Sequence, residues 1–241
     1  MDFCYYPALP AGLLDDDILT VLPEERCPYL PGRRARYRAF LAGHMSATQY
    51  HRLMDRGFRR SSELFYQPVC AGCRECVPIR VPVTGFAPSK SQRRVWRQNQ
   101  DLVVTARRTE DRPELLTLFL KYQKQWHGEE RAEEGAEAYL FESPVETEVF
   151  TYRLKGRLVA AGVCDVSRYS LSSVYFYFDP ELGERSLGTL GALWEIEHAR
   201  AAGIPYYYLG YWVRDCGAMA YKAKFRPFEV LGADGVWRAG G

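Results

Sequence analysis

Cysteines in the first hundred residues have a spacing that could support chemistry. Cys70, Cys73 and Cys76 form a C-x2-C-x2-C run, and Cys27 lies further upstream. Four thiolates suit tetrahedral zinc or an iron–sulfur cluster, although the fourth close cysteine of the common cluster motif is absent. The spacing therefore predicts either a zinc or cluster site at these four cysteines or a knuckle of reduced thiols that orders a loop.

A basic tract, SKSQRRVWRQN, begins thirteen residues after the cysteine run. Its cations are Lys90, Arg93, Arg94 and Arg97. Small polar residues lie between them and suit phosphate and ribose contacts, and Trp96 could stack on a base. Residues 26–108 carry 17 Lys and Arg against four acidic residues. We expect this basic stretch to bind RNA, the alternative being a solvated surface.

Three other arginines differ from this tract. Arg80 alternates within the apolar run VPIRVPV, and Arg59 and Arg60 form an adjacent pair. An arginine within an apolar strand usually needs a carboxylate partner. For Arg80 that partner is either an internal acidic residue or the carboxylate of a substrate.

The second half of the chain contains an aromatic strand that ends on an acid. Tyr175, Tyr177 and Asp179 alternate along it, so they share one face of the strand. If Phe176 and Phe178 pack inward, that face borders a cleft. Core packing of all the aromatics is the alternative.

These residues need a scaffold, and the order of elements indicates one. We predict a hairpin over residues 148–166, a strand over 171–178, a helix that starts at Ser186 and ends before Gly203, and a strand over 204–212. This order is the one expected of a GNAT-like acyltransferase core. The predicted fold is therefore α+β or α/β, with an N-terminal Cys-bearing domain over residues 1–108 and a GNAT-like domain over 109–241.

Two more helices are predicted from local signals. Ser46 with Gln49 forms a capping box at the start of the first. The second is predicted because four apolar residues fall on one helical face. They are Leu115, Phe119, Tyr122 and Trp126.

The turn before the helix at Ser186 resembles the pyrophosphate-binding turn of GNAT enzymes, [QR]-x-x-G-x-[GA]. Arg185 and Gly188 match that pattern, whereas Leu190 occupies a position that needs a small residue. This difference argues against coenzyme A and favours a different acyl carrier.

Composition limits the location and partners of the chain. It has 241 residues, of which 47% are hydrophobic, with a net charge of +2. No apolar run reaches the roughly 18 residues of a membrane span, and the start lacks signal-peptide features. We expect a cytoplasmic, monomeric protein with no membrane partner.

Seven segments together resemble the bacterial aminoacyl-tRNA–protein transferases, whose usual form is the aspartate/glutamate leucyltransferase and which are related to arginyl-tRNA–protein transferases. They are CPYLPGR, MSATQYHRLMDRGFRRS, CAGCRECVPIRV, FAPSKSQRR, LSSVYFYFDPELGERSLGTLGALWEI, PYYYLGYWV and MAYKAKFRP. They span nearly the whole chain, and several are long.

The resemblance implies a reaction and its partners. An aminoacyl-tRNA would give its amino acid to the α-amine of a protein that begins with Asp or Glu, marking that protein for degradation by the N-degron pathway. The ester of aminoacyl-tRNA is already activated, so the chemistry requires no cofactor. Leucine is the expected donor, arginine is the alternative, and a CoA-dependent GNAT enzyme or a non-catalytic RNA-binding module are rival interpretations.

Site roles are assigned on this basis as hypotheses. The candidates for orienting or deprotonating the amine, or for binding the oxyanion, are Asp165, Tyr175, Tyr177 and Asp179. The acceptor carboxylate is assigned first to Arg80, then to Arg59 and Arg60. Lys222 and Lys224 are expected to meet the acceptor end of the tRNA.

Overall fold

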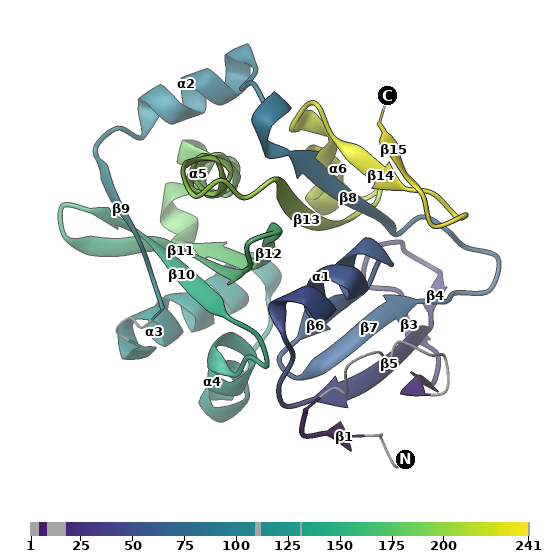
Figure 1. Cartoon of the computed structure of the whole chain (residues 1–241). Coiled ribbons are helices and arrows are strands. Elements are labelled where there is room, and N and C mark those ends of the chain that lie inside the picture. The colour runs from purple at the N-terminus through teal and green to yellow at the C-terminus, as the bar shows by residue number, and fades with distance from the viewer. Residues whose placement is uncertain (1–4, 9–17, 109–111, 131, 241) are drawn as a thin grey trace.

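The computed structural model describes residues 5–8, 18–108, 112–130 and 132–240, and it contains two main sheets (Figure 1). The larger sheet has the strand order β15-β14-β8-β13-β12-β11-β10-β9. In chain order these strands are β8 (Val77–Pro82), β9 (Leu102–Arg107), β10 (Thr147–Leu154), β11 (Arg157–Val166), β12 (Ser170–Phe178), β13 (Tyr206–Trp212), β14 (Glu229–Leu231) and β15 (Trp237–Ala239).

The larger sheet confirms the predicted order of elements. β10 and β11 form the hairpin, and β12, α5 (Leu187–Ala201) and β13 follow it. β12 and β13 are the one parallel pair among the described strands of this sheet. They run in the same direction because the crossover through α5 returns the chain to the end of the sheet where β12 began. The fold is therefore mixed α and β with a GNAT-like half.

Helices cover both faces of the larger sheet. α2 (Lys90–Gln98) and α5 pack on one face, which carries Phe150 and Tyr152 of β10. α3 (Arg112–Tyr122) and α4 (Glu133–Phe141) cover the other face, where they pack with Val149. Val149 lies next to Phe150 in β10 and therefore points to the opposite side of the sheet.

The predicted apolar face of α3 ends one turn early. Leu115, Phe119 and Tyr122 are buried, whereas Trp126 is 52% exposed. The reason is a π-helical turn, η3 (Gln123–His127), which shifts the side-chain period after Tyr122.

The smaller sheet and α1 (Ala47–Asp55) enclose a second core, which includes Phe40, Phe65 and Leu53. The strands of this sheet are β1 (Tyr5–Tyr6), β2 (Thr20–Val21), β5 (Tyr37–Ala42), β6 (Arg59–Ser61) and β7 (Leu64–Pro68). The predicted capping box of Ser46 and Gln49 begins α1. Tyr208 of β13 packs into this core, so it joins the two sheets.

The remaining described elements are short. They are β3 (Glu25–Arg26) with β4 (Arg34–Ala35), η2 (Val83–Gly85), η4 (Pro180–Arg185), α6 (Gly217–Ala220) and η5 (Tyr221–Lys224). Within the described ranges, no helix combines the length and apolarity that crossing a bilayer requires.

The division between the sheets differs from the predicted boundary at residue 108. β8, α2 and β9 precede that residue, yet all three belong to the larger sheet or its covering layer. The change of sheet falls between β7 and β8, at the cysteine run. The predicted boundary followed the end of the basic stretch at residue 108 and the start of the helix expected after it.

Candidate active site

The larger sheet loses its pairing between its two parallel strands. β12 and β13 pair only from Ser170 to Ser172 against Tyr206 to Tyr208, although both strands continue further. Tyr175 and Ser173 face consecutive residues of β11, which makes Val174 the extra residue of a β-bulge. Beyond Ser172, the described parts of β12 and β13 therefore do not pair with each other. We call this unpaired stretch the strand opening.

Arg59 lies at the start of the strand opening. It comes from β6 of the smaller sheet, and its Nη1 donates to Ser172 Oγ at 2.7 Å while its Nη2 donates to the Ser173 carbonyl oxygen. The guanidinium also lies over Gly210 of β13, where a Cβ would be 3.5 Å from Nε. Gly210 has φ +89°, so both its conformation and its close approach to Arg59 favour glycine.

Arg59 is a buried cation with neutral partners. Its residue is 8% exposed, and in the described part of the chain no carboxylate lies within ion-pair distance of it. A buried charge without a counter-ion is costly, because neutral hydrogen-bond acceptors replace only part of its hydration. The arrangement therefore favours binding of an anion at this position.

The other two arginines assigned to the acceptor have internal counter-ions. Arg80 Nη1 lies 2.7 Å from Asp55 Oδ1, and its Nε lies 2.7 Å from Glu229 Oε2. Its guanidinium also lies over the rings of Tyr206 and Trp237. Arg80 was the first choice for binding the acceptor carboxylate. It pairs instead with internal acidic residues, which was the alternative interpretation.

Arg60 forms a buried ion pair across the two sheets. Its Nε donates to Asp165 Oδ2 at 2.7 Å, and both side chains are almost fully buried. Thr147 donates to the same carboxylate at 3.0 Å. The predicted role of Asp165 as a base for the amine does not fit this position, because its oxygens are occupied by Arg60 and Thr147.

Asp179 is also bound by cations. Lys121 Nζ lies 2.7 Å from its Oδ1 and Arg157 Nη1 lies 2.6 Å from its Oδ2. Burial raises the pKa of Asp179, but hydrogen bonds from Lys121, from the Glu181 backbone N–H and from Arg157 outweigh it and hold that pKa below its ordinary value. A carboxylate with a lowered pKa is a weak proton acceptor, so Asp179 does not fit the role of base either.

Tyr175 and Tyr177 share a face of β12, as predicted, but that face packs beneath α3 and α4. Tyr177 is fully buried in the core there, so it does not border a cleft. Tyr175 is half-buried, and its hydroxyl donates to Gln123 Oε1 at 3.1 Å. The structure therefore gives Tyr177 a packing role and puts Tyr175 against the π-helical turn.

Lys222 and Lys224 occupy different environments. Lys224 is exposed, and its carbonyl oxygen accepts from Gln92 Nε2 of α2 at 3.2 Å, so it lies beside the basic tract. Lys222 is buried, and its Nζ donates to the Tyr211 carbonyl oxygen at 2.9 Å. Lys222 therefore lies at β13 and not on the basic surface.

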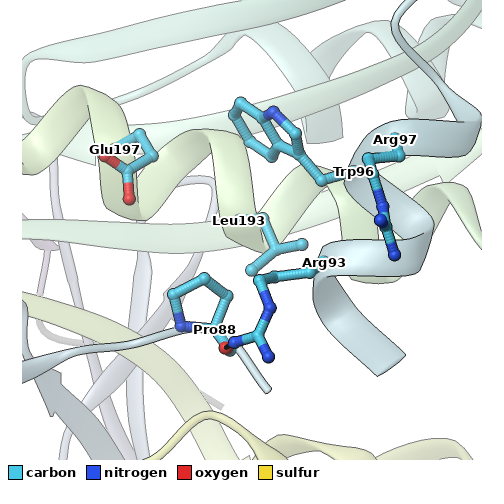
Figure 2. Close-up of a pocket in the computed structure, with 6 residues that line it drawn as sticks. All are labelled: Pro88, Arg93, Trp96, Arg97, Leu193 and Glu197. Carbon is cyan, nitrogen blue, oxygen red and sulfur yellow. Dashed lines mark hydrogen bonds between the residues drawn. The ribbon is translucent and has the colours of Figure 1, made fainter. Parts of the chain in front are cut away.

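The basic tract forms an exposed helical surface. A capping box of Ser89 and Gln92 begins α2, and burial of Gln92 and Val95 turns the cations outward. The exposed cations are Lys90, Arg93, Arg94 and Arg97. A pocket of about 350 Å³ lies between α2 and α5, as Figure 2 shows. Its lining residues are Pro88, Arg93, Trp96, Arg97, Leu193 and Glu197.

The four cysteines of the predicted metal or cluster site lie near one another. Burial raises the pKa of the Cys76 thiol to about 12, and the neighbouring thiols of Cys27, Cys70 and Cys73 contribute to this rise. Among the residues that the structure describes, no group of three or more His, Cys, Asp or Glu could hold a metal ion. Binding of zinc or a cluster at these cysteines stays a prediction.

The GNAT-like turn before α5 is not free for a pyrophosphate. Arg185 forms two hydrogen bonds of 2.9 Å with the carboxylate of Asp101. Leu190 is buried in the main core, where a large residue is needed for packing. Both features oppose a CoA-binding interpretation.

Sequence reasoning missed Ser172, Ser173 and Gly210 as partners of Arg59. One signal was available, because an isolated glycine within the strand pattern YYYLGYW indicates a close approach of another group. The serines carry no such signal, since their role depends on a residue more than a hundred positions away.

Known protein families match both parts of the chain. The model for the N terminus of arginine-tRNA-protein transferase matches residues 25–94, and the model for its C terminus matches residues 114–232. An aspartate/glutamate leucyltransferase of Alcanivorax borkumensis is 38% identical over 222 residues, covering 90% of this chain and 91% of that protein. The one from Gluconacetobacter diazotrophicus is 40% identical over 222 residues, covering 88% and 83%.

Two solved structures share the fold. L-PGS from Bacillus licheniformis superposes with a TM-score of 0.51 at 13% identity, and a C-terminal DUF2156 domain from Agrobacterium fabrum with 0.50 at 16%. Each covers 83% of this chain, which in turn spans 66% and 65% of theirs, just under two thirds. At these identities the likeness concerns the fold alone.

Proposed function

Because the chain belongs to the arginine-tRNA-protein transferase family, we propose that it transfers leucine from leucyl-tRNA to the α-amine of proteins that begin with Asp or Glu. It is a transferase, and the relatives at 38–40% identity are aspartate/glutamate leucyltransferases. The new N-terminal leucine marks the acceptor for the N-degron pathway. We place the reaction in the cytoplasm, where charged tRNA is available, and in a monomer, since one chain carries both Arg59 and the cations of α2.

The observation that carries this proposal is the buried cation of Arg59 at the strand opening, which has no carboxylate partner among the residues that the structure describes. An acceptor that begins with Asp or Glu brings a side-chain carboxylate, which is the counter-ion that Arg59 lacks. An arginine fork pairs strongly with a carboxylate, and a desolvated site strengthens that pairing. Peptides that begin with neutral residues would leave the cation unpaired and bind less well.

The reaction itself is aminolysis of an ester. The α-nitrogen attacks the carbonyl carbon of leucyl-tRNA, an amide bond forms, and the ester bond to the terminal ribose breaks. The leaving ribose oxygen takes up a proton. Since the ester is already activated, the main task of the enzyme is to hold the two substrates in the correct orientation. Beyond Ser173, the described part of β12 has no pairing with β13, and its backbone groups on that side are suited to fixing the acyl group.

The tRNA is proposed to lie across α2. Its exposed cations and the nearby Lys224 form one basic surface, and the adjacent pocket between α2 and α5 has arginines at its border and Trp96 in its wall. Asn99, which ends α2, donates to the Arg185 carbonyl oxygen at 3.0 Å, so this surface continues toward the start of α5. A backbone held there would lead its acceptor end toward the strand opening.

Charge reversal on α2 tests this placement. Arg94→Glu combined with Arg97→Glu should raise the Kd for tRNA at least about 10-fold, because repulsion replaces the attraction of two phosphates. The slope of log Kd against log salt should fall by about 0.7–0.9 for each phosphate that is no longer neutralised. Both are measured by filter binding over a salt series.

The matched control is Arg238→Glu, which reverses an exposed arginine at the far C-terminal hairpin. It should leave both the Kd and the salt slope unchanged. Equal weakening by the control and the α2 variant would remove the assignment of this surface to tRNA.

The donor is tested by supplying leucyl-tRNA and arginyl-tRNA separately with a labelled amino acid and a peptide that begins with Asp. Transfer of leucine supports the proposal as stated. Transfer of arginine in its place keeps the reaction but changes the donor, and no transfer from either charged tRNA would overturn the proposed function.

A further inference from the structure

A buried amine lies beside the same strand opening. Lys222 is 9% exposed, and its Nζ bonds to the carbonyl oxygen of Tyr211, in the stretch of β13 that lies beyond the pairing with β12. As with Arg59, the structure gives Lys222 no carboxylate partner within the described ranges. A lysine is almost never fully buried unless it is paired, because burial without a counter-ion disfavours the charged form.

The chain fixes Lys222 by a short turn. β13 is followed by α6 and then by the 3-10 turn η5, which carries Lys222 back against β13. Phe225, directly after the turn, is buried and stacks on Phe86 in the main core. The packing of Phe225 therefore fixes the C-terminal side of the turn that carries the amine.

Arg59 and Lys222 approach neighbouring residues of one strand. The guanidinium lies over Gly210 and the amine bonds to Tyr211. Consecutive Cα atoms are about 3.8 Å apart. In an N-terminal Asp or Glu, the α-nitrogen and the side-chain carboxylate are likewise only a few bonds apart. A carboxylate bound to Arg59 would thus bring its own α-nitrogen to the region of Lys222.

The electrostatic surroundings suit a neutral amine. Burial, followed by repulsion from Arg59, lowers the pKa of Lys222 to about 7, although the Cys216 and Cys76 thiols act in the opposite direction. Among the described residues, these main charged and ionisable neighbours come from β6, from the start of α6 and from the segment before β8. A free α-amine has a pKa of about 7.7–8.0, so near pH 7 it arrives protonated while much of Lys222 is neutral.

We propose that Lys222 is the catalytic base that takes the proton from the α-ammonium group of the bound acceptor. The N–H bond of the ammonium breaks, its electron pair stays on nitrogen, and the proton forms a bond with Nζ. The neutral α-nitrogen then attacks the ester carbonyl, and its second proton leaves with the ribose oxygen. Lys222 returns its proton to solvent after the product departs. This inference rests on the proposed function. The two carboxylates that the sequence suggested for the role of base, Asp165 and Asp179, are both held in ion pairs.

The test is the pH dependence of kcat/KM for an Asp peptide, between about pH 6 and pH 9.5, in the full-length protein. Lys222→Gln should lower kcat/KM by about 10²–10⁴-fold near pH 7, which is the usual contribution of a general base. The loss should shrink as the pH rises above the pKa of the peptide amine, because the acceptor then arrives neutral. A loss of equal size at every pH, or no loss, would overturn the proposal.

Two further variants separate chemistry from structure. Lys222→Arg keeps the positive charge but cannot lose it, so it should be as impaired as the glutamine variant. Full activity in Lys222→Arg would show that the charge alone matters and would overturn the proposal. Lys155→Gln removes a lysine from an exposed turn and should match the wild-type profile.

One measurement needs no variant for its main readout. In the wild-type protein, ¹⁵N NMR of labelled lysine should show one amine titrating near pH 7, assigned by its loss in Lys222→Arg. Titration of every lysine above about pH 10 would overturn the proposal even if the variants fail to fold. If the wild-type protein transfers no amino acid at all, the proposed function fails instead, so the two failures are distinguishable.

Discussion

Replacing Arg59 by methionine should lower kcat/KM for peptides that begin with Asp or Glu by at least about 100-fold, because an uncompensated carboxylate would then enter a buried site. Methionine keeps much of the side-chain volume, so packing over Gly210 is retained. The discrimination between Asp and Ala peptides, which we expect to be about two orders of magnitude in the wild type, should largely disappear. Steady-state transfer of labelled leucine measures both quantities.

Three controls accompany this variant. Its Kd for tRNA and its thermal unfolding should stay close to the wild-type values, which separates acceptor recognition from folding. Arg59→Lys should recover part of the preference for Asp, since the charge remains but the fork is lost. Unchanged discrimination between Asp and Ala in Arg59→Met would refute the role of Arg59.

Arg60→Met should destabilise the protein by about 3–5 kcal/mol, because it leaves the buried Asp165 carboxylate without its cation. For a chain of this length, that corresponds to a fall in Tm of roughly 6–20 °C. Calorimetry measures the change. The ion pair joins β6 of the smaller sheet to β11 of the larger, so its loss also weakens the connection between the sheets.

The double variant Arg60→Met with Asp165→Leu removes both charges and should recover most of the lost stability. Glu130→Gln, which breaks an ion pair between side chains that are 70% and 81% exposed, is the matched control and should leave Tm unchanged. If Arg60→Met shifts Tm no more than Glu130→Gln does, the buried pair does not stabilise the fold as argued.

Local signals predicted the elements well. The predicted serine cap with glutamine three residues later begins α1, and the helix predicted from Ser186 ends before Gly203, whereas the same signal at the start of α2 was not recognised. These features depend on a few consecutive residues, so one sequence is enough to read them. Hairpin and strand order followed from alternation and turn residues in the same way.

The pairing of charges could not be predicted, because partners come from distant parts of the chain. Arg59, Arg60 and Arg80 were all assigned to the acceptor carboxylate, yet Asp165 neutralises the second, and Asp55 with Glu229 neutralises the third. Only the assembled fold shows that the first has no carboxylate partner within the described ranges. Alternation likewise placed Tyr177 on a strand face but could not say that α3 covers this face.

The role of Arg59 in acceptor recognition is tested most sharply with two nearly isosteric acceptors, a peptide that begins with Asp and one that begins with Asn, with leucyl-tRNA and wild-type protein. The pair differs by one charge, which is what a buried unpaired arginine should detect. We predict transfer of leucine to both the Asp and Glu peptides with kcat/KM at least about 100-fold above that of the Asn peptide. Equal transfer to Asp and Asn would contradict this role.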